Sequence, residues 1–209
     1  LVDLNAYRIR DAVAQAAGKT NGRHLTSDEA ESLLARHMHR HGEPHIIALS
    51  GMITTLRWQE RTVATCRRLC PDAFIVSGGG LVTEVKEGLF GWIPDLDAIV
   101  HSEGDDVMLV LARDVHRHLH HGSSLESVPE CLGSIGGRDR YLYGGDRPND
   151  LDTLPFAAWD LLHQDVDGNP ILEWYIKTPV WGLAANNSSA TPFTMTRSLT
   201  TVSSRGCPY

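Results

Sequence analysis

Three short loops of this 209-residue chain combine glycine with hydroxyl or carboxylate side chains in a way that suits a bound ligand. They are residues 50–55, 77–81 and 102–105. Glycine lets the backbone approach a ligand closely, and serine hydroxyls can replace hydrogen bonds that a polar ligand loses on leaving water. The Ser-Gly-Gly-Gly stretch at 77–80 lacks the G-x-G-x-x-G spacing of a dinucleotide site and the G-K-[ST] of a phosphate-binding loop. A plain chain turn is an equal alternative for this loop taken alone.

Histidines and cysteines suggest metal binding as a second kind of chemistry, but their surroundings favour structural roles. Two groups of histidines have a metal-compatible spacing, at His37, His39, His41 and His45 and at His116, His118, His120 and His121. Neither group is accompanied by cysteine or glutamate ligands, so we expect solvated helix faces. Cys66 and Cys70 share one face of a predicted helix with Leu69, which favours small buried apolar side chains over ligands or a redox pair.

The elements that must position the three loops follow from the hydrophobic pattern. Short apolar runs predict strands at 1–4, 45–49, 73–76 and 96–100. Amphipathic spacing predicts helices at 26–39, 57–69, 83–89 and 105–120, and Thr26 and Glu29 form a capping-box pair at the first of them. This alternation predicts an α/β, doubly wound (flavodoxin-like or Rossmann-like) fold whose parallel sheet is covered on both faces. Right-handed crossovers then bring the strand-to-helix loops to one edge of the sheet, where a ligand should lie across them.

The pattern divides the chain into three parts. Residues 1–121 are the predicted α/β domain, and 122–198 read as a linker or docking region, with one hairpin near 140–143 and an apolar patch at 150–162. Residues 199–209 are expected to begin a further domain. Because neither end looks like a domain boundary, we expect the chain to be an internal piece of a longer protein.

Composition narrows the classes of function. Hydrophobic residues make up 42% of the chain and the net charge is −7, which argues against a disordered chain and against a nucleic-acid-binding surface. No apolar run approaches the roughly 20 residues needed to cross a bilayer, and the first residues do not form a secretory signal. Four cysteines are too few for a disulfide scaffold. We therefore expect a cytoplasmic protein with no membrane span and no nucleic-acid partner.

The loops also carry a resemblance to a known family. Ser-Gly-Met at 50–52 and Gly-Gly at 78–79 resemble the Ser-x-Leu and Gly-Gly signatures of cobalamin-binding domains. The turn at 102–105 resembles the Gly-Glu-Gly-Glu turn after the fifth strand of this domain in cobalamin-dependent radical SAM proteins. Residues 152–160 are similar to the linker that follows the domain, and 204–209 to the entry of the Cys-x-x-x-Cys-x-x-Cys cluster loop. The four motifs occur in the family's order and span the chain.

The resemblance implies that cobalamin lies over the carboxyl edge of the sheet, with its nucleotide tail beside the strands. The triple glycine would leave room for that tail, Ser50 would hydrogen-bond it, and Glu103 would accept hydrogen bonds from its hydroxyls or from backbone N–H groups. The implied cofactor-binding residues are Ser50, Gly51, Met52, Ile53, Thr54, Ser77, Gly78, Gly79, Gly80, Ser102, Glu103 and Gly104.

The chain departs from the wider cobalamin-binding pattern at its beginning. It contains no Asp-x-His-x-x-Gly motif, whose histidine ligates cobalt from below and which in the family follows the first strand. We place that strand upstream of Leu1, so that residues 1–4 would be the second strand in a 2-1-3-4-5 order. For His101, at a predicted strand end beside this edge, a structural role is favoured over cobalt ligation.

The end of the chain implies a second cofactor. Cys207 matches the first ligand of the family's [4Fe–4S] cluster, whose other cysteines would lie beyond this piece. The resemblance implies a parent enzyme that uses S-adenosylmethionine (SAM), the cluster and cobalamin for radical methylation or anaerobic oxidative cyclisation of a small-molecule or peptide substrate. The piece alone is expected to be inactive. Two alternatives stay open: a non-catalytic cobalamin carrier or sensor, and a flavodoxin-like nucleotide-binding domain without a corrin.

Overall fold

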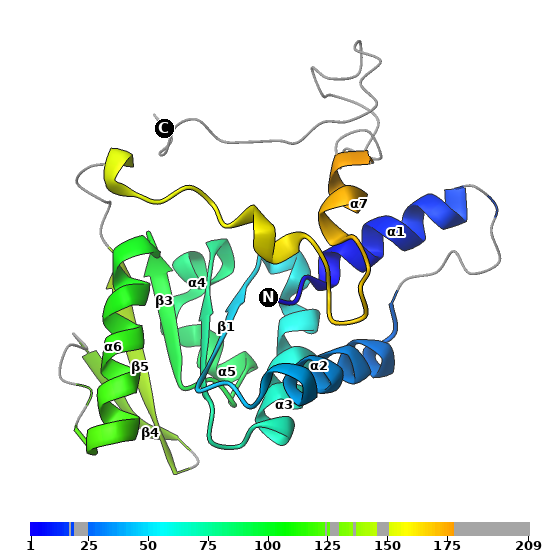
Figure 1. The fold of residues 1–209 in the computed structure, drawn as a ribbon. Coiled ribbons are helices and arrows are strands. Elements are labelled where there is room, and N and C mark those ends of the chain that lie inside the picture. The colour runs from blue at the N-terminus through cyan, green and yellow to red at the C-terminus, as the bar shows by residue number, and fades with distance from the viewer. Residues whose placement is uncertain are drawn as a thin grey trace. The chain divides into compact units, whose positions relative to one another are not determined.

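The chain forms two compact units. The computed structural model describes residues 1–16, 18, 25–123, 125, 130–135, 137–145 and 151–177 (Figure 1). The first unit combines Leu1–Leu33 with Ala157–Tyr209, and the second unit is Leu34–Phe156. The three predicted ligand loops all belong to the second unit.

The second unit is built on a five-stranded, mostly parallel sheet. Its strands are β1 (Ile46–Ser50), β2 (Phe74–Gly78), β3 (Ala98–Ser102), β4 (Glu130–Ile135) and β5 (Arg138–Gly145). They lie in the order β1-β2-β3-β5-β4, and only β4 is antiparallel to its neighbour. The α/β class is confirmed, and the strands predicted at 45–49, 73–76 and 96–100 are present as β1, β2 and β3 within one or two residues.

Helices cover both faces of this sheet. Figure 1 shows α6 (Asp105–His121) on one face and α3 (Leu56–Leu69), α4 (Gly80–Val85) and α5 (Leu89–Trp92) on the other. The short 3₁₀ helices η1 (Ile53–Thr55) and η2 (Lys86–Gly88) precede α3 and separate α4 from α5. The core under α6 consists of Val76, Ala98, Val100, Val107, Leu111, Val115 and Tyr143.

The single helix predicted at 83–89 differs from the structure. Helical structure begins earlier, at Gly80, and is divided into three short pieces. Lys86 has a positive φ of 48°, which interrupts the regular helical hydrogen bonding after α4.

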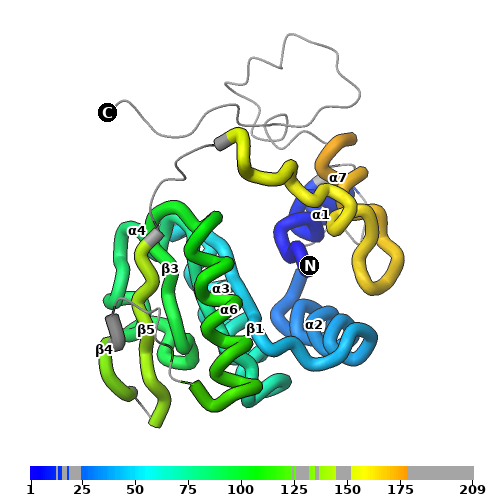
Figure 2. The backbone as a smooth tube through the Cα atoms, turned by 60° about the vertical axis from the view of Figure 1, so that its left-hand side comes forward, coloured from blue at the N-terminus to red at the C-terminus, as the bar shows by residue number. Residues whose placement is uncertain are grey.

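The sheet continues beyond residue 121, into the segment predicted as a linker. The expected hairpin near 140–143 is present as β4 and β5, and β5 pairs in parallel with β3 (Figure 2). Residues 178–209 lie outside the described part of the chain, and with them the predicted start of a further domain at 199–209.

The first unit shows that the strand predicted at 1–4 is wrong. Leu4 begins the helix α1 (Leu4–Ala16). The carboxylate of Asp3 accepts hydrogen bonds from the backbone N–H groups of Asn5 (2.9 Å) and Ala6 (3.2 Å). An N-terminal cap of this kind stabilises the first helical turn, and it prevails over the strand preference of the preceding apolar residues.

Among the described residues of the first unit, further helices surround a small apolar cluster. Besides α1, they include η4 (Trp159–Leu162), α7 (Ile171–Lys177) and the beginning of α2 (Ser27–His41). Thr26 and Glu29 form the predicted capping box at the start of α2, because each side chain accepts from the other's backbone N–H. Ala6, Tyr7, Leu33 and Ile171 form the cluster. The second unit also contains the short 3₁₀ helix η3 (Leu151–Thr153), shortly before its last residue, Phe156.

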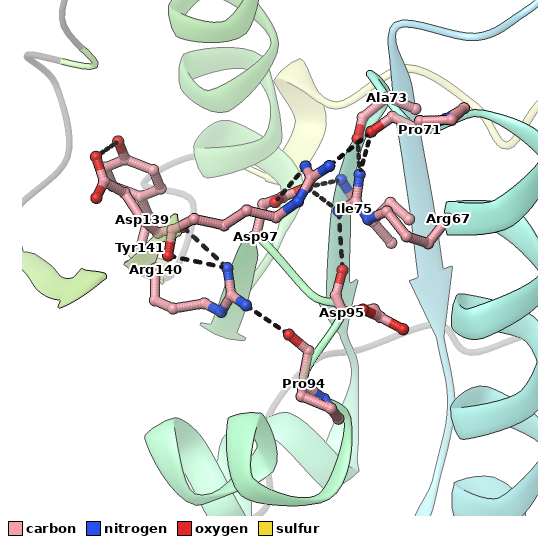
Figure 3. Close-up of polar contacts among 11 residues, drawn as sticks. Arg67, Pro71, Ala73, Ile75, Pro94, Asp95, Asp97, Asp139, Arg140 and Tyr141 are labelled. Carbon is pink, nitrogen blue, oxygen red and sulfur yellow. Dashed lines mark hydrogen bonds and ion pairs between the residues drawn. The ribbon is translucent and has the colours of Figure 1, made fainter. Parts of the chain in front are cut away.

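A buried charge network holds the amino edge of the sheet, opposite the loops. Arg67 of α3 donates to Asp97 Oδ2 at 2.6 Å, and the same oxygen accepts from the backbone N–H of Ile75 at 2.7 Å (Figure 3). The guanidinium also donates to the carbonyls of Pro71, Ala73 and Asp95. The network therefore ties the end of α3 to the starts of β2 and β3.

None of the helices in the described residues is both long and apolar enough to cross a membrane.

Candidate functional site

The three predicted loops meet at the carboxyl edge of the sheet. β1 ends at Ser50, directly opposite Gly78 at the end of β2, and β3 ends at Ser102. Ser50 Oγ lies 3.1 Å from the point that a Cβ atom on Gly79 would occupy. The first two loops are therefore in direct contact, as the topology of a parallel sheet requires.

Gly79 is glycine because of the chain's own packing. Its φ is +94°, and a Cβ atom at this position would lie 2.9 Å from the carbonyl oxygen of Gly51. The same carbonyl accepts a hydrogen bond from the N–H of Leu81 at 3.4 Å. Gly80 differs, since nothing lies within 4 Å of its would-be Cβ atom. Of the three glycines, the third thus borders open space, whereas Gly79 permits close contact between two loops.

The first loop presents apolar side chains to solvent. Met52 and Ile53 are 63% and 60% exposed, and Thr54 beside them is also exposed. The loop is nevertheless held in one conformation, because the Thr55 hydroxyl donates to the Met52 carbonyl (2.8 Å) and accepts from the Met52 N–H (3.1 Å). Exposed apolar side chains on an ordered loop can pack against an apolar part of a ligand.

A buried polar chain fixes this loop to β2. Ser77, which is fully buried, donates to Gln59 Oε1 at 3.0 Å, and Gln59 Nε2 donates to the Thr55 hydroxyl at 3.2 Å. Ser77 thus supports the site from within and does not face a ligand. Sequence reasoning missed Gln59, although one signal was present: it is a polar residue on the same helical face as the buried Val63 and Cys66.

The third loop is joined to the second by a residue that the sequence analysis did not single out, Thr83. The N–H of Ser102, whose φ is +65°, donates to Thr83 Oγ1 at 3.0 Å, and the Thr83 hydroxyl donates to the Gly79 carbonyl at 3.3 Å. The sequence does contain a signal for the bond to Gly79: Thr83 stands four residues after this N-cap, and a helical threonine commonly bonds the carbonyl four residues before it.

The remaining residues of the third loop lie at the start of α6. Glu103 and Gly104 are half-buried, and Gly104 is the N-cap whose carbonyl accepts from the Met108 N–H at 3.0 Å. His101 packs against Gly144 of β5, and its Nδ1 lies 3.1 Å from the Ser102 hydroxyl.

On the α6 face of the sheet, side chains become smaller toward the site. Ile46 and Phe74 begin this face in β1 and β2, and alternation places Ala48 beside Val76 and Ser50 beside Gly78 on the same face. Ala48 and Ser50 are exposed and Gly78 is half-buried. We call Ala48, Ser50 and Gly78 the small-residue stripe. Its exposed members, Ala48 and Ser50, run along β1 to the carboxyl edge of the sheet.

The two cysteines near the end of α3 are buried and free, Cys66 within the helix and Cys70 at its C-cap. Cys66 and Cys70 are 1% and 2% exposed, and neither forms a disulfide. Burial raises the pKa of the Cys66 thiol to about 11, so the reactive thiolate is scarce at neutral pH. These thiols behave as the small buried apolar groups that the sequence predicted.

Histidine rings lie close together in tilted pairs on two of the helices. The ring centroids of His37 and His41 are 4.6 Å apart, and those of His116 and His120 are 4.4 Å apart. Within the described residues, no cluster of three or more His, Cys, Asp or Glu side chains could hold a metal ion. The predicted cluster ligand Cys207 lies outside those residues.

Neither a protein-family model nor a curated protein matches the chain. Among solved structures, the chain is similar to the N-terminal domain of a hypothetical protein from Thermotoga maritima. The two are 16% identical, the match covers 69% of this chain and 94% of that chain, and the TM-score is 0.33.

Proposed function

We propose that the second unit binds cobalamin across the carboxyl edge of its sheet. The observation that carries this proposal is the small-residue stripe, which begins beside the Ser50–Gly79 contact and continues along β1. A long, partly polar cofactor arm can lie against strands only where side chains are small. The hydroxyl of Ser50 stands at the entrance of this stripe and bonds no described residue. It is available to a polar group of the arm.

The first loop fits the corrin ring of the same cofactor. Met52 and Ile53 expose apolar surface at the edge of the sheet, and the Thr55 hydroxyl holds their loop in place. Covering these two side chains with a large flat ring would remove apolar surface from water, which is favourable by about 25 cal/mol per Å². The third loop, with Glu103 and Gly104, lies at the end of β3 and supplies polar contacts there.

We further propose that the chain is the cobalamin-binding part of a radical SAM enzyme. The support is the motif order: the loops of the second unit, the segment around Phe156 and then Cys207. In such a parent, SAM and a [4Fe–4S] cluster would supply a radical, and cobalamin would support methylation or oxidative cyclisation of a small-molecule or peptide substrate. This chain's own residues bind and orient the corrinoid.

Reconstitution with hydroxocobalamin tests the binding proposal. The wild-type protein, incubated with hydroxocobalamin and desalted, should retain corrinoid absorbance. Ala48→Leu fills the stripe without burying a polar group and should lose most of that absorbance. Ala64→Leu, a substitution of an exposed alanine on α3, is the matched control and should retain it.

Two results would contradict the proposal. One is a wild-type protein that is colourless after desalting while its circular dichroism shows a folded α/β domain. The other is an Ala48→Leu protein that retains as much corrinoid as the wild type. Retention of flavin mononucleotide in place of the corrinoid would favour the flavodoxin-like alternative.

A further inference from the structure

Thr83 links two loops of the proposed site through its side-chain hydroxyl. Its hydroxyl donates to the carbonyl of Gly79, in the second loop, at 3.3 Å. The same oxygen accepts from the N–H of Ser102, in the third loop, at 3.0 Å. One hydroxyl therefore uses its donor on one loop and one of its two acceptor lone pairs on the other.

The residue at the far end of this link has an unusual backbone. Ser102 has a φ of +65°, a conformation that residues with a side chain rarely adopt. Such a conformation persists only where its surroundings hold it in place, and it occurs preferentially at functional sites. The hydrogen bond from the Ser102 N–H to Thr83 is an interaction that holds it.

The first of the two hydrogen bonds alone would have a local explanation. A threonine in a helix commonly bonds the carbonyl four residues before it, and Thr83 stands in this relation to Gly79. The second bond has no such explanation, because Ser102 is 19 residues away, at the end of strand β3. Through Thr83, the position of Ser102 at the end of β3 depends on the position of the glycine loop after β2.

We propose that Thr83 is a positioning residue of the corrinoid site. It fixes the loops after β2 and β3 in one relative arrangement, so that a ligand lying across the carboxyl edge meets both without reordering them. Pre-organisation of this kind raises affinity by reducing the ordering that binding requires. This inference rests on the proposed cobalamin function, but the arrangement of the loops can be tested without a ligand.

The first test uses the ligand-free protein. Amide hydrogen exchange at Ser102 should be slow in the wild type and at least about tenfold faster in Thr83→Val, which keeps the shape but removes the hydroxyl. Exchange within β1 should be the same in both proteins, because a general loss of stability would raise it too. Equal exchange at Ser102 in the two proteins would overturn the inference, whatever the ligand.

The second test measures hydroxocobalamin affinity. Thr83→Val should bind about tenfold more weakly than the wild type, which corresponds to loss of roughly one pre-ordering hydrogen bond. Thr83→Ser keeps the hydroxyl and should restore affinity to within about twofold of the wild type. Thr65→Val is the matched control, since this half-buried threonine of α3 has no side-chain bond to a described residue, and its affinity should be unchanged.

A double variant separates positioning from a general structural role. Glycine adopts positive φ without strain, so Ser102→Gly should make Thr83 largely dispensable. In the Ser102→Gly background, adding Thr83→Val should weaken binding by only about twofold instead of tenfold. A full tenfold loss in that background would contradict the inference. If the wild type itself binds no hydroxocobalamin, the proposed function fails, and the exchange experiment still decides the role of Thr83.

Discussion

Gly79 and Gly80 are neighbours with opposite structural requirements. A side chain at Gly79 would meet the backbone of Gly51 and would impose strain at a φ of +94°. A side chain at Gly80 would meet nothing, and this residue is the first of helix α4. The Ser-Gly-Gly-Gly motif at 77–80, which suggested a ligand site, thus also allows the first and second loops to pack closely together.

The two glycines predict opposite effects of the same substitution. Gly79→Ala should lower the free energy of unfolding by about 2 kcal/mol, because the conformation is disfavoured and the Gly51 carbonyl must move. Gly80→Ala should leave it unchanged or raise it by up to about 1 kcal/mol, because alanine favours the helix. Urea unfolding monitored by circular dichroism measures both. Equal destabilisation by the two substitutions would contradict this account of Gly79.

At this scale, residues that form motifs were easier to predict than residues that support them. Ser50 and Gly79 stand out because they follow apolar strands, and the structure places them in contact. Thr83 and Gln59 act through hydrogen bonds to partners 19 and 18 residues away. Such partners depend on how the strands are placed side by side, which composition and spacing along the chain do not reveal.

At the amino edge of the sheet, opposite the site, charged side chains connect the elements that carry the site. Asp97, before β3, accepts from Arg67 of α3 and from the backbone of β2, and both charged side chains are nearly buried. Arg138 of β5 also approaches Asp97, at 3.6 Å. The network around Asp97 therefore fixes the distances between α3, β2 and β3. These distances also determine how far apart the loops at the carboxyl edge lie.

Removing the negative charge from this network should be costly. Asp97→Asn leaves the buried guanidinium of Arg67 without its counter-charge and should lower the free energy of unfolding by about 3 kcal/mol. Glu60→Gln is the matched control, because Glu60 pairs with Arg57 on the exposed surface of the same helix, and its effect should stay within about 0.5 kcal/mol. Comparable losses from both variants in chemical denaturation would show that the network is not what holds this edge.

Among the elements, strong local signals decided which predictions were confirmed. The apolar runs that became β1, β2 and β3 are short, uniformly apolar and followed by glycine or serine, and all three were predicted. Residues 1–4 have a similar apolar character, but the Asp3 cap turns the chain into α1 instead. The pairing of β5 with β3 could not be predicted, because a local hairpin pattern does not say which strand it will join.

For the whole molecule, the parallel pairing of β1, β2 and β3 brings the three loops to one edge of the sheet. The small-residue stripe then results from a single register, in which Ala48 and Ser50 lie opposite Val76 and Gly78. A shift by one residue would turn the stripe to the other face of the sheet. The proposed function thus depends on the pairing of β1 with β2.

Comparison of two corrinoids tests the central claim most directly. Hydroxocobalamin carries the nucleotide arm, whereas aquocobinamide has the same ring without it. If the stripe receives the arm, titration should show at least about tenfold tighter binding of hydroxocobalamin to the wild type. Ala48→Leu should reduce that difference to about twofold or less. Equal affinity of the wild type for both corrinoids, or no binding of either, would contradict the account.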